Sequence, residues 1–263
     1  MFDEDIEELA LLVQKSRRAV VFTGAGISTE CGIPDFRSPG GFWTKYKPIE
    51  FRDFLASAET RFEAWARFLM IRETIAEAEP GSSHRAVAEL VSRGHVSHVI
   101  TQNIDGLHAR AGIPQEQIIE IHGNGTYATC LACGLRHEID WVKEVMAETA
   151  KPPACVACGG IVKSATISFG QSMPEQAMAD ARAATFNADL FIAIGSSLQV
   201  FPAAGFPVTA ARNRTPLIII NREPTGLDGL ARLVIHAEIA PVLDRVMLHF
   251  APKDRITLAS AKL

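Results

Sequence analysis

The sequence predicts an α/β fold in which a parallel sheet carries helices on both faces. Short apolar runs alternate with amphipathic helical segments along most of the chain, as in parallel sheets that are buried on both sides. Polar residues directly follow five of these runs. Two CxxC pairs interrupt the alternation between residues 126 and 165. We therefore expect a Rossmann-like parallel sheet with helices on both faces, plus a smaller zinc-ribbon and helical domain.

Composition limits the classes of protein to which the chain can belong. It has 263 residues, 48% of them hydrophobic, and a net charge of −4, which suffices for one sizeable core and a small module. The slight acidity argues against a direct nucleic-acid partner. No apolar run approaches the roughly 18 residues of a membrane span, so we expect no membrane association. The N-terminus is acidic and then amphipathic, unlike a signal peptide, which predicts a cytoplasmic protein. We also expect the protein to be a monomer.

The first strand leads into a glycine-rich turn. Residues 19–22 form a buried apolar run, which is followed by Gly24-Ala25-Gly26 and what is expected to be the start of a helix. Such a turn lets backbone N–H groups approach a phosphate at the positive end of a helix. A dinucleotide fingerprint would place a third glycine near residue 29, where this chain has Thr29. A tight turn without a ligand remains an alternative.

The remaining elements follow from periodicity and from helix-capping residues. Ser82 or Ser83 is expected to cap a helix, which makes His84 a surface or capping histidine. The aromatic residues of 50–79 are expected to be core. The expected helices cover 3–16, two segments within 50–79, Ser82 or Ser83 to 91, 107–111, 141–146, 174–186, a segment after Pro202 and 239–249; the expected strands are 19–22, 98–101, 118–121, 190–194, 217–220 and 233–236.

Polar clusters follow five of the predicted strands. Because the carboxyl ends of parallel strands meet at one edge of the sheet, where ligands bind, these clusters should lie together. They are Gly24–Ser28, Gln102–Asp105, His122–Gly125, Gly195–Ser197 and Asn221–Glu223. The pattern predicts a ligand site at that edge.

Several side chains in these clusters could act on a ligand. A neutral His122 could take a proton from a hydroxyl near pH 7, although a structural role is equally open. Asn103 and Asp105 could hold an amide, a water or a ribose, or Asp105 could cap a helix. Glu223 could bind a ribose diol, or be a solvated surface charge. It lies far beyond the usual 20 or so residues after the glycines, so the cofactor orientation should differ from that of a dehydrogenase.

The two CxxC pairs predict a metal site. Cys130 and Cys133 are separated from Cys155 and Cys158 by a long central loop, and no secretory signal favours disulfides. Four thiolates would close a tetrahedral site, which indicates structural zinc. A catalytic zinc and a redox disulfide are the alternatives. We interpret the fifth cysteine, Cys31, as a small buried residue.

Together these segments resemble the sirtuins, the NAD-dependent protein lysine deacylases. The similar segments are GAGIST with GIPDFR at 24–37, TQNIDGLH at 101–108, IHG at 121–123, the CxxC pairs, FG at 169–170, GSSLQV at 195–200 and the late strand ending in IIIN. The resemblance implies removal of acetyl or other neutral acyl groups from protein lysine, with release of nicotinamide and O-acyl-ADP-ribose. NAD would be consumed, and one structural Zn²⁺ retained. The alternative is a protein mono-ADP-ribosyltransferase or NAD glycohydrolase that uses the same pocket.

The resemblance also implies a division of the chain and roles for residues. Residues 1–36, 82–125 and 166–263 would form the NAD-binding domain, 37–81 a helical lid part of the small domain, and 126–165 the four-cysteine zinc-binding module. His122 would be the general base, with Asn103 as the second catalytic residue. The implied cofactor-binding residues are Gly24, Ala25, Gly26, Thr29, Phe36, Arg37, Gln102, Asn103, Asp105, Gly195, Ser196, Asn221 and Glu223; Phe169, Gly170, Leu198 and Val200 would bind the acyl-lysine substrate.

Three departures from the family pattern concern the substrate. Gln171 stands where the family commonly has Glu, and Ser164 where many members have Pro. Both leave the peptide preference undecided. Members that prefer succinyl groups carry a Tyr and an Arg three residues apart. In the corresponding segment this chain has only Tyr46 with Ile49 three residues later, which favours neutral acyl groups.

Overall fold

A computed structural model describes residues 3–35 and 47–251. Its larger part is a six-stranded sheet in the order β3-β2-β1-β7-β8-β9, in which every neighbouring pair is parallel. Counted along the chain within this sheet, the order is that of a Rossmann fold, and the direction of winding reverses between β1 and β7. The strands are β1 (Ala19–Thr23), β2 (Val96–Thr101), β3 (Ile118–Glu120), β7 (Leu190–Ile194), β8 (Leu217–Ile220) and β9 (Leu233–Ile235).

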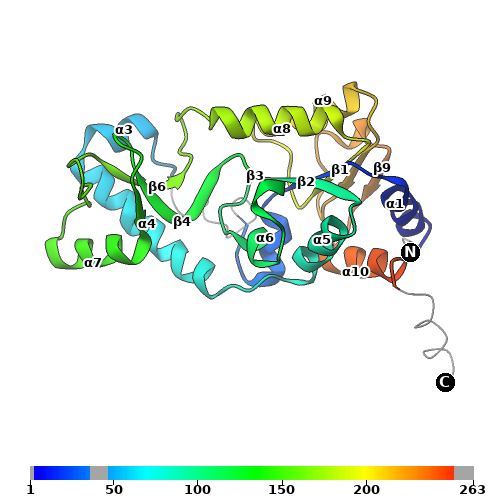
Figure 1. Ribbon diagram of the computed structural model, residues 1–263, viewed down its shortest axis with the longest axis horizontal. Helices are drawn as coiled ribbons and strands as arrows, with labels where there is room; N and C mark the ends of the chain where they lie inside the picture. Colours follow the sequence, from blue (N-terminus) through cyan, green and yellow to red (C-terminus); the bar gives the residue numbers. More distant parts are fainter. Residues whose placement is uncertain (1–2, 36–46, 252–263) are drawn as a thin grey trace, which may run out of the picture.

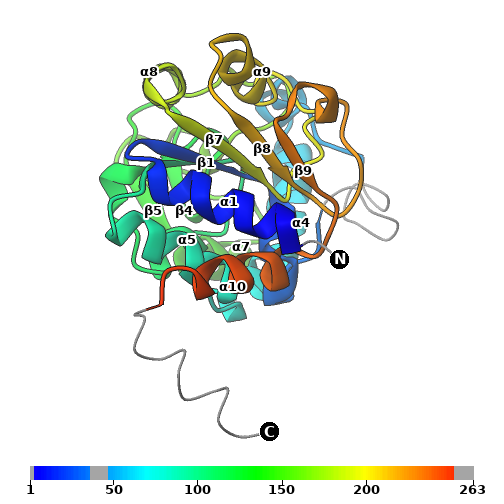
Figure 2. The same cartoon turned by 90° about the vertical axis from the view of Figure 1, so that its right-hand side faces the viewer.

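Helices cover both faces of this sheet, as predicted. Figure 2 shows α1 (Asp3–Lys15), α5 (Ser82–Ser92) and α10 (Ile239–Leu248) on one side and α8 (Glu175–Asn187) and α9 (Gly205–Arg212) on the other. Successive residues of β1 alternate between the two cores: Val21 packs with the first set of helices, and Phe22 with the second. Every residue of β1, β7 and β8 is buried, which explains their uninterrupted apolar sequences.

A smaller sheet lies at the opposite end of the molecule from α1 (Figure 1). It is antiparallel, in the order β5-β4-β6, and is formed by β4 (Gly123–Cys130), β5 (Arg136–Glu138) and β6 (Val162–Thr166). The helices α3 (Phe51–Ala56), α4 (Ala58–Glu77) and α7 (Ile139–Thr149) accompany it. Trp65 of α4 joins the core beneath this sheet and donates its indole N–H to the Val162 carbonyl oxygen at 3.1 Å.

The remaining elements are short: α6 (Leu107–Arg110) and the 3₁₀ helices η1 (Ala25–Cys31), η2 (Gln115–Gln117) and η3 (Asp228–Leu230). The helix expected after the glycine turn is present, as a 3₁₀ helix. One local expectation was wrong. Gly123 begins strand β4 directly after His122, where a loop was expected, because its pairing with Thr166 of β6 recruits the glycine-rich segment into the small sheet.

The expectation for His84 was also wrong. Its side chain is fully buried, and its ring centroid lies 5.1 Å from that of His108. No serine caps α5. Glu30 does so from η1, because its carboxylate accepts a hydrogen bond from the Ser83 backbone N–H at 2.8 Å. The predicted core role of the aromatic residues in α4 is confirmed for Trp65. Among the described helices, none has the length and apolar character needed to cross a membrane.

Candidate active site

A cavity of about 790 Å³ opens at the carboxyl edge of the parallel sheet. The loops after β1, β2, β7 and β8 line one end of it, and β6 with the segment after it lines the other. Four of the five predicted polar clusters therefore meet here directly. The fifth contributes His122. Helix α4 closes one side of the cavity with apolar side chains. The predicted ligand edge is thus confirmed as the location of a large cavity.

The loops after β1 and β7 interlock at the switch point of the sheet. The Gly26 backbone N–H donates to the Gly195 carbonyl oxygen at 2.9 Å. A Cβ on Gly24 would lie 2.6 Å from that same oxygen. Gly195 has a φ of +63°, and a Cβ on it would lie 2.5 Å from the Ile27 nitrogen. Because side chains are excluded here, the backbone of both loops lies at the cavity surface, as phosphate binding requires.

The segment after β2 fastens this edge together. Gln102 donates to the Ser196 hydroxyl oxygen at 2.8 Å and so links the end of β2 to the end of β7. The Asn103 amide donates to the Gly24 carbonyl and to the Ser28 hydroxyl oxygen, both at 3.1 Å. Gln102 and Asn103 both line the cavity.

Asp105 lies behind this lining and does not reach the cavity. Its carboxylate accepts hydrogen bonds from the Ser28 hydroxyl at 2.7 Å and from the Leu107 backbone N–H at 2.9 Å. The second bond is the helix cap that the sequence left open as an alternative. Asp105 therefore positions η1 relative to α6.

His122 sits where the chain leaves the large sheet and enters the small one. Its Nδ1 lies 3.1 Å from the Gln102 carbonyl oxygen. A carbonyl only accepts, so Nδ1 carries the proton, and Nε2 keeps the lone pair of a base. Burial lowers the pKa of His122, and the hydrogen bond to Gln102 opposes this shift. The arrangement presents a neutral imidazole to the cavity at neutral pH.

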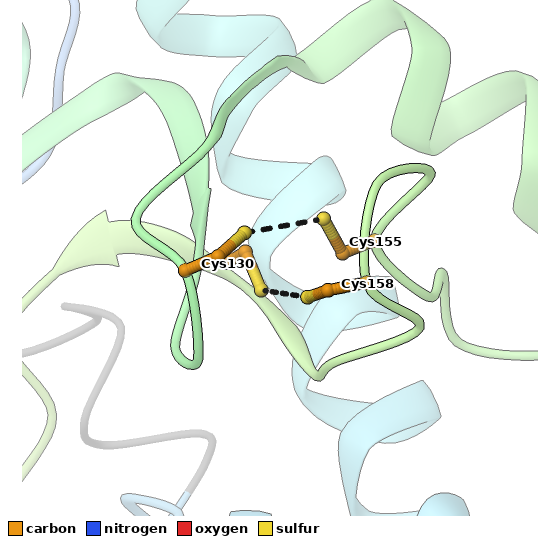
Figure 3. Close-up of side chains that lie close together, drawn as sticks. Cys130, Cys155 and Cys158 are labelled. Atoms are coloured by element: carbon orange, nitrogen blue, oxygen red, sulfur yellow. Dashed lines mark hydrogen bonds between the residues drawn. The ribbon is translucent and has the colours of Figure 1, made fainter.

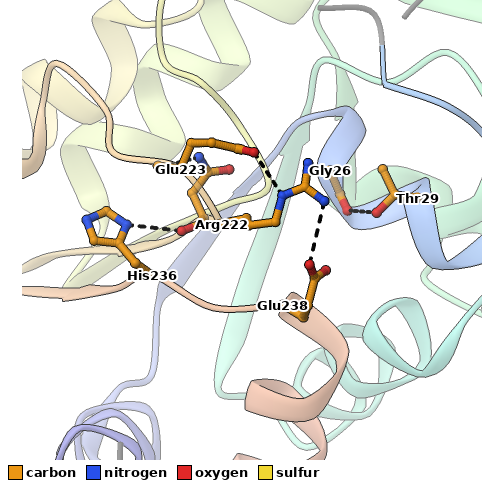
Figure 4. A network of polar contacts seen from close by, with 7 residues as sticks. Gly26, Thr29, Arg222, Glu223, His236 and Glu238 are labelled. Atoms are coloured by element: carbon orange, nitrogen blue, oxygen red, sulfur yellow. Dashed lines mark hydrogen bonds and ion pairs between the residues drawn. The ribbon is translucent and has the colours of Figure 1, made fainter. Parts of the chain in front are cut away.

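The loops after β8 and β9 supply a charged end to the cavity (Figure 4). The Asn221 amide donates to the Glu223 carbonyl oxygen at 2.7 Å. Arg222 pairs with the Glu223 carboxylate at 2.8 Å and lies 3.6 Å from that of Glu238. These exposed ion pairs contribute little stability. They leave two carboxylates beside one guanidinium, which disfavours an added phosphate at this end.

The predicted substrate residues divide into two groups. Phe169, Gly170 and Val200 line the cavity, whereas Leu198 is buried in the core against α8 and α9. Ser164 and Gln171, which differ from the residues common in the family, also line the cavity. The Ser164 hydroxyl lies 2.8 Å from that of Thr166, and the Gln171 amide oxygen accepts the Ser168 backbone N–H at 3.1 Å.

A family model, described as the Sir2 family, matches residues 24–202 of the chain. The chain belongs to the Sir2 family. It is 53% identical over 238 residues to NAD-dependent protein deacetylase 1 of Bradyrhizobium diazoefficiens, covering 90% of this chain and 93% of that protein. It is 51% identical to NAD-dependent protein deacetylase of Rhodopseudomonas palustris, with 90% and 94% covered. The predicted resemblance to sirtuins is confirmed.

Solved structures of the Sir2 family share the fold. One, described as Sir2 with a p53 peptide and NAD⁺, has a TM-score of 0.81 and 31% identity, and the match covers 95% of this chain and 98% of that one. Another, described as Sir2Tm bound to a propionylated peptide, has a TM-score of 0.82 and 32% identity, with 93% and 98% covered. The predicted fold class is therefore confirmed.

Four cysteines converge in the small sheet of this Sir2 protein (Figure 3). The sulfurs of Cys130 and Cys158 lie 3.5 Å apart, and those of Cys133 and Cys155 lie 3.7 Å apart. These separations exceed a disulfide bond and approach the roughly 3.8 Å edge of a tetrahedron with zinc–sulfur bonds of about 2.3 Å. A Cβ on Gly160 would lie 2.9 Å from the Cys130 sulfur. The donors and the cleared space both fit a structural zinc.

The predicted site residues and the residues that line the cavity do not coincide completely. Phe36 and Arg37 lie outside the described residues. Sequence reasoning missed Glu238 and Ile239, which line the cavity just after β9. The expectation that polar residues after a strand lie at the ligand edge, applied to the predicted strand 233–236, would have identified Glu238 but not the apolar Ile239. It also missed Lys163, which lines the cavity from within β6, where no local pattern marks it.

Proposed function

We propose that this Sir2 protein removes acetyl or other neutral acyl groups from protein lysine in a reaction that consumes NAD and releases nicotinamide and O-acyl-ADP-ribose. One observation carries the proposal. A single cavity joins the glycine-lined edge of the parallel sheet to the segment around Phe169, with His122 between them. The curated relatives are named NAD-dependent protein deacetylases. The cavity thus offers a dinucleotide end and a peptide end on the two sides of one base.

In this proposal His122 takes the proton from a ribose hydroxyl. Its Nε2 is available because Nδ1 is committed to the Gln102 carbonyl oxygen. Asn103 and Gln102 would frame the nicotinamide end, and the backbone of Gly24 to Gly26 would meet the phosphates. Asn221 and Glu223 would hold the adenosine half. Phe169, Gly170 and Val200 would contact the substrate backbone, as an added strand does.

The side chains along α4 favour neutral acyl groups. Ala64, Trp65, Phe68 and Ile71 line the cavity with apolar atoms. Arg67 also lines it, but donates to the Lys47 carbonyl oxygen at 2.8 Å and pairs with Glu63. An acyl carboxylate would have to compete for that guanidinium.

Lys163 is another cation that lines the cavity. Its ammonium group donates to the carbonyl oxygens of Ser164 and Thr166, and burial lowers its pKa to about 8. It stays mostly protonated at pH 7, but two backbone acceptors already occupy its N–H groups. It therefore adds little attraction for an acidic acyl chain.

We further infer the domain division of the chain, its location and its partners. The separate cores of the two sheets support the predicted division into 1–36 with 82–125 and 166–263, a helical part at 37–81, and the cysteine module at 126–165. The bound zinc would hold that module in shape. We propose a cytoplasmic monomer with no nucleic-acid or membrane partner; the slight net negative charge supports the absence of a nucleic-acid partner.

The test measures deacetylation of an acetyl-lysine peptide, with and without NAD. We expect turnover only with NAD, and a loss of about 10²- to 10⁴-fold in the His122→Ala variant. His98→Ala is the matched control, since that histidine lies on β2 outside the cavity. Equal turnover in wild type and His122→Ala would refute the role assigned to His122.

The same reactions, run with NAD labelled in its ADP-ribose part, address the alternative functions. Label on O-acetyl-ADP-ribose supports the deacylase. Label on protein, with the peptide still acetylated, would instead identify a mono-ADP-ribosyltransferase. Free labelled ADP-ribose with the peptide unchanged would identify an NAD glycohydrolase.

A further inference from the structure

A second group of metal-ligating side chains lies outside the cavity, at the junction of η1 and α5. It consists of Glu30 and Cys31 at the end of η1 and His84 in the first turn of α5. One ligand atom from each lies within 4.8 Å of the other two. The Cys31 sulfur is 3.7 Å from His84 Nδ1. None of the three residues lines the cavity or belongs to the four-cysteine cluster.

His84 is poorly explained as a purely structural residue. Its side chain is fully buried, yet Nε2 has no hydrogen-bond partner within the described part of the chain. A sulfur is the neighbour of Nδ1, and a thiol is a weak hydrogen-bond partner. Leaving buried polar atoms so poorly satisfied costs free energy. A cation bound to Nδ1 would replace this weak sulfur contact with a strong bond.

The ligand set selects a class of cation. We propose that Glu30, Cys31 and His84 form a second binding site for a thiophilic divalent cation of the zinc class. Thiolate, imidazole and carboxylate are all zinc ligands, and three protein ligands leave a fourth position for water. Zinc bonds of about 2.3 Å to sulfur and 2.0 to 2.1 Å to nitrogen place those two atoms about 3.5 Å apart. The separation of Cys31 and His84 needs little adjustment.

The three groups suit a cation better than they suit oxidation. Burial raises the pKa of the Cys31 thiol, which leaves little thiolate to react with an oxidant, whereas a bound cation would itself displace the thiol proton. Burial also lowers the pKa of His84, so the imidazole is neutral and its lone pair is available. Glu30 can keep its bond to the Ser83 N–H through Oε1, while Oε2 exchanges the Ser82 hydroxyl, 3.3 Å away, for the cation.

A cation at this site would join η1 to α5. Cys31 ends η1, whose Ala25, Gly26 and Thr29 line the cavity, and His84 begins α5, which belongs to the core of the large sheet. Binding would therefore link η1, which lines the cavity, to the core of the large sheet. It should raise the melting temperature, because the unfolded chain lacks the assembled site.

The test counts zinc in purified protein whose four-cysteine cluster is fully loaded. Zn²⁺ is added in competition with a chromophoric chelator, and alkylation of Cys31 is followed by peptide mass spectrometry. Wild type should bind two equivalents, and the second should slow alkylation of Cys31. Cys31→Ser should bind one. Glu30→Gln, which retains an acceptor for the Ser83 N–H, should bind the second about 10- to 100-fold more weakly.

Glu89→Gln is the matched control, because it changes the same functional group on the exposed side of α5. It should bind two equivalents with wild-type affinity. The proposal is overturned if wild type binds only one equivalent, or if Cys31→Ser keeps the second with unchanged affinity. Wild-type affinity in Glu30→Gln would overturn the three-ligand site. Since these readouts do not involve deacylation, they are independent of the proposed function.

Discussion

The two sheets of this Sir2 protein are held together in different ways. The parallel sheet lies between two extensive apolar cores, which extend into α1, α5 and α10 on one face and α8 and α9 on the other. The small sheet has one compact core, and Cys130 and Cys155 are among its few buried members. A small module cannot bury enough surface to be stable alone. Apolar burial therefore suffices to stabilise the large sheet, whereas the small sheet also needs metal ligation to be stable.

The largest effect should come from removing one cysteine of the cluster. In zinc-finger peptides a structural zinc contributes about 10 to 16 kcal/mol, more than a small apolar core can replace. Cys130→Ser should therefore release zinc and unfold β4 to β6 with α7, while β1 and β7 stay protected. Hydrogen exchange of individual segments measures both parts. Val156→Ser is the control, since Val156 lies between Cys155 and Cys158 but is 72% exposed and supplies no ligand. Native protection of α7 without zinc would contradict the comparison.

Gly195→Ala should produce the next largest effect, this time in the large sheet. The added Cβ meets the Ile27 nitrogen at 2.5 Å, and the φ of +63° disfavours any side chain. Strained backbone of this kind costs on the order of 1 to 3 kcal/mol. We expect a lower melting temperature and NAD binding weaker by about tenfold or more, since 1.4 kcal/mol corresponds to a factor of ten.

Gly205→Ala is the matched control for this substitution. A Cβ at Gly205 meets nothing within 4 Å. Its stability and its NAD affinity, measured by calorimetry, should both stay close to wild type. Equal behaviour of the two alanine variants would mean that the interlocked loops do not depend on glycine at the switch point.

Trp65→Phe tests the contact between α4 and the small sheet. The indole N–H donates to the Val162 carbonyl oxygen at 3.1 Å in a buried position. Phenylalanine keeps most of the apolar contact and leaves that oxygen unpaired, which costs about 1 to 3 kcal/mol. Hydrogen exchange of the backbone amides should become faster in β6 but not in β8. Trp141→Phe retains a ring to stack on His137 and serves as the control; equal exchange in the two variants would show that the N–H bond is dispensable.

The large sheet was predictable because its determinants are local. Uninterrupted apolar strands identify a parallel sheet, and parallel strands bring their polar ends to one edge. That geometry alone placed Gly24, Gln102, His122, Gly195 and Asn221 around one cavity. Glu238 escaped only because the rule was not applied to the last strand.

The misses arose where distant segments decide local structure. His84 looks like a surface residue on its own helix, but His108 and Cys31 enclose it from two other elements. The serines before that helix look like caps, yet Glu30, remote in sequence, supplies the acceptor. Likewise Gly123 looks like a turn until β6 pairs with it. No short sequence window contains these partners.

The smallest expected effect is the pH dependence that His122 gives to catalysis. His122 links the two sheets. The backbone of β3 leads into it from the large sheet, and its carbonyl oxygen accepts the Ile167 N–H, just after β6, at 2.9 Å. Burial lowers the pKa of His122 from its ordinary value of 6.5. Since a base must be neutral, kcat/KM should fall only when the pH drops below that value. His122→Ala should lack this acid limb.

The same residue can report on the comparison of the two sheets. If the small sheet unfolds in Cys130→Ser, the cover from β6 is lost and His122 becomes more exposed. Its pKa should then rise toward 6.5, because less burial penalises the charged form less. NMR titration of the His122 ring protons measures the shift. An unchanged His122 pKa in the zinc-free variant would show that the large sheet alone buries this base.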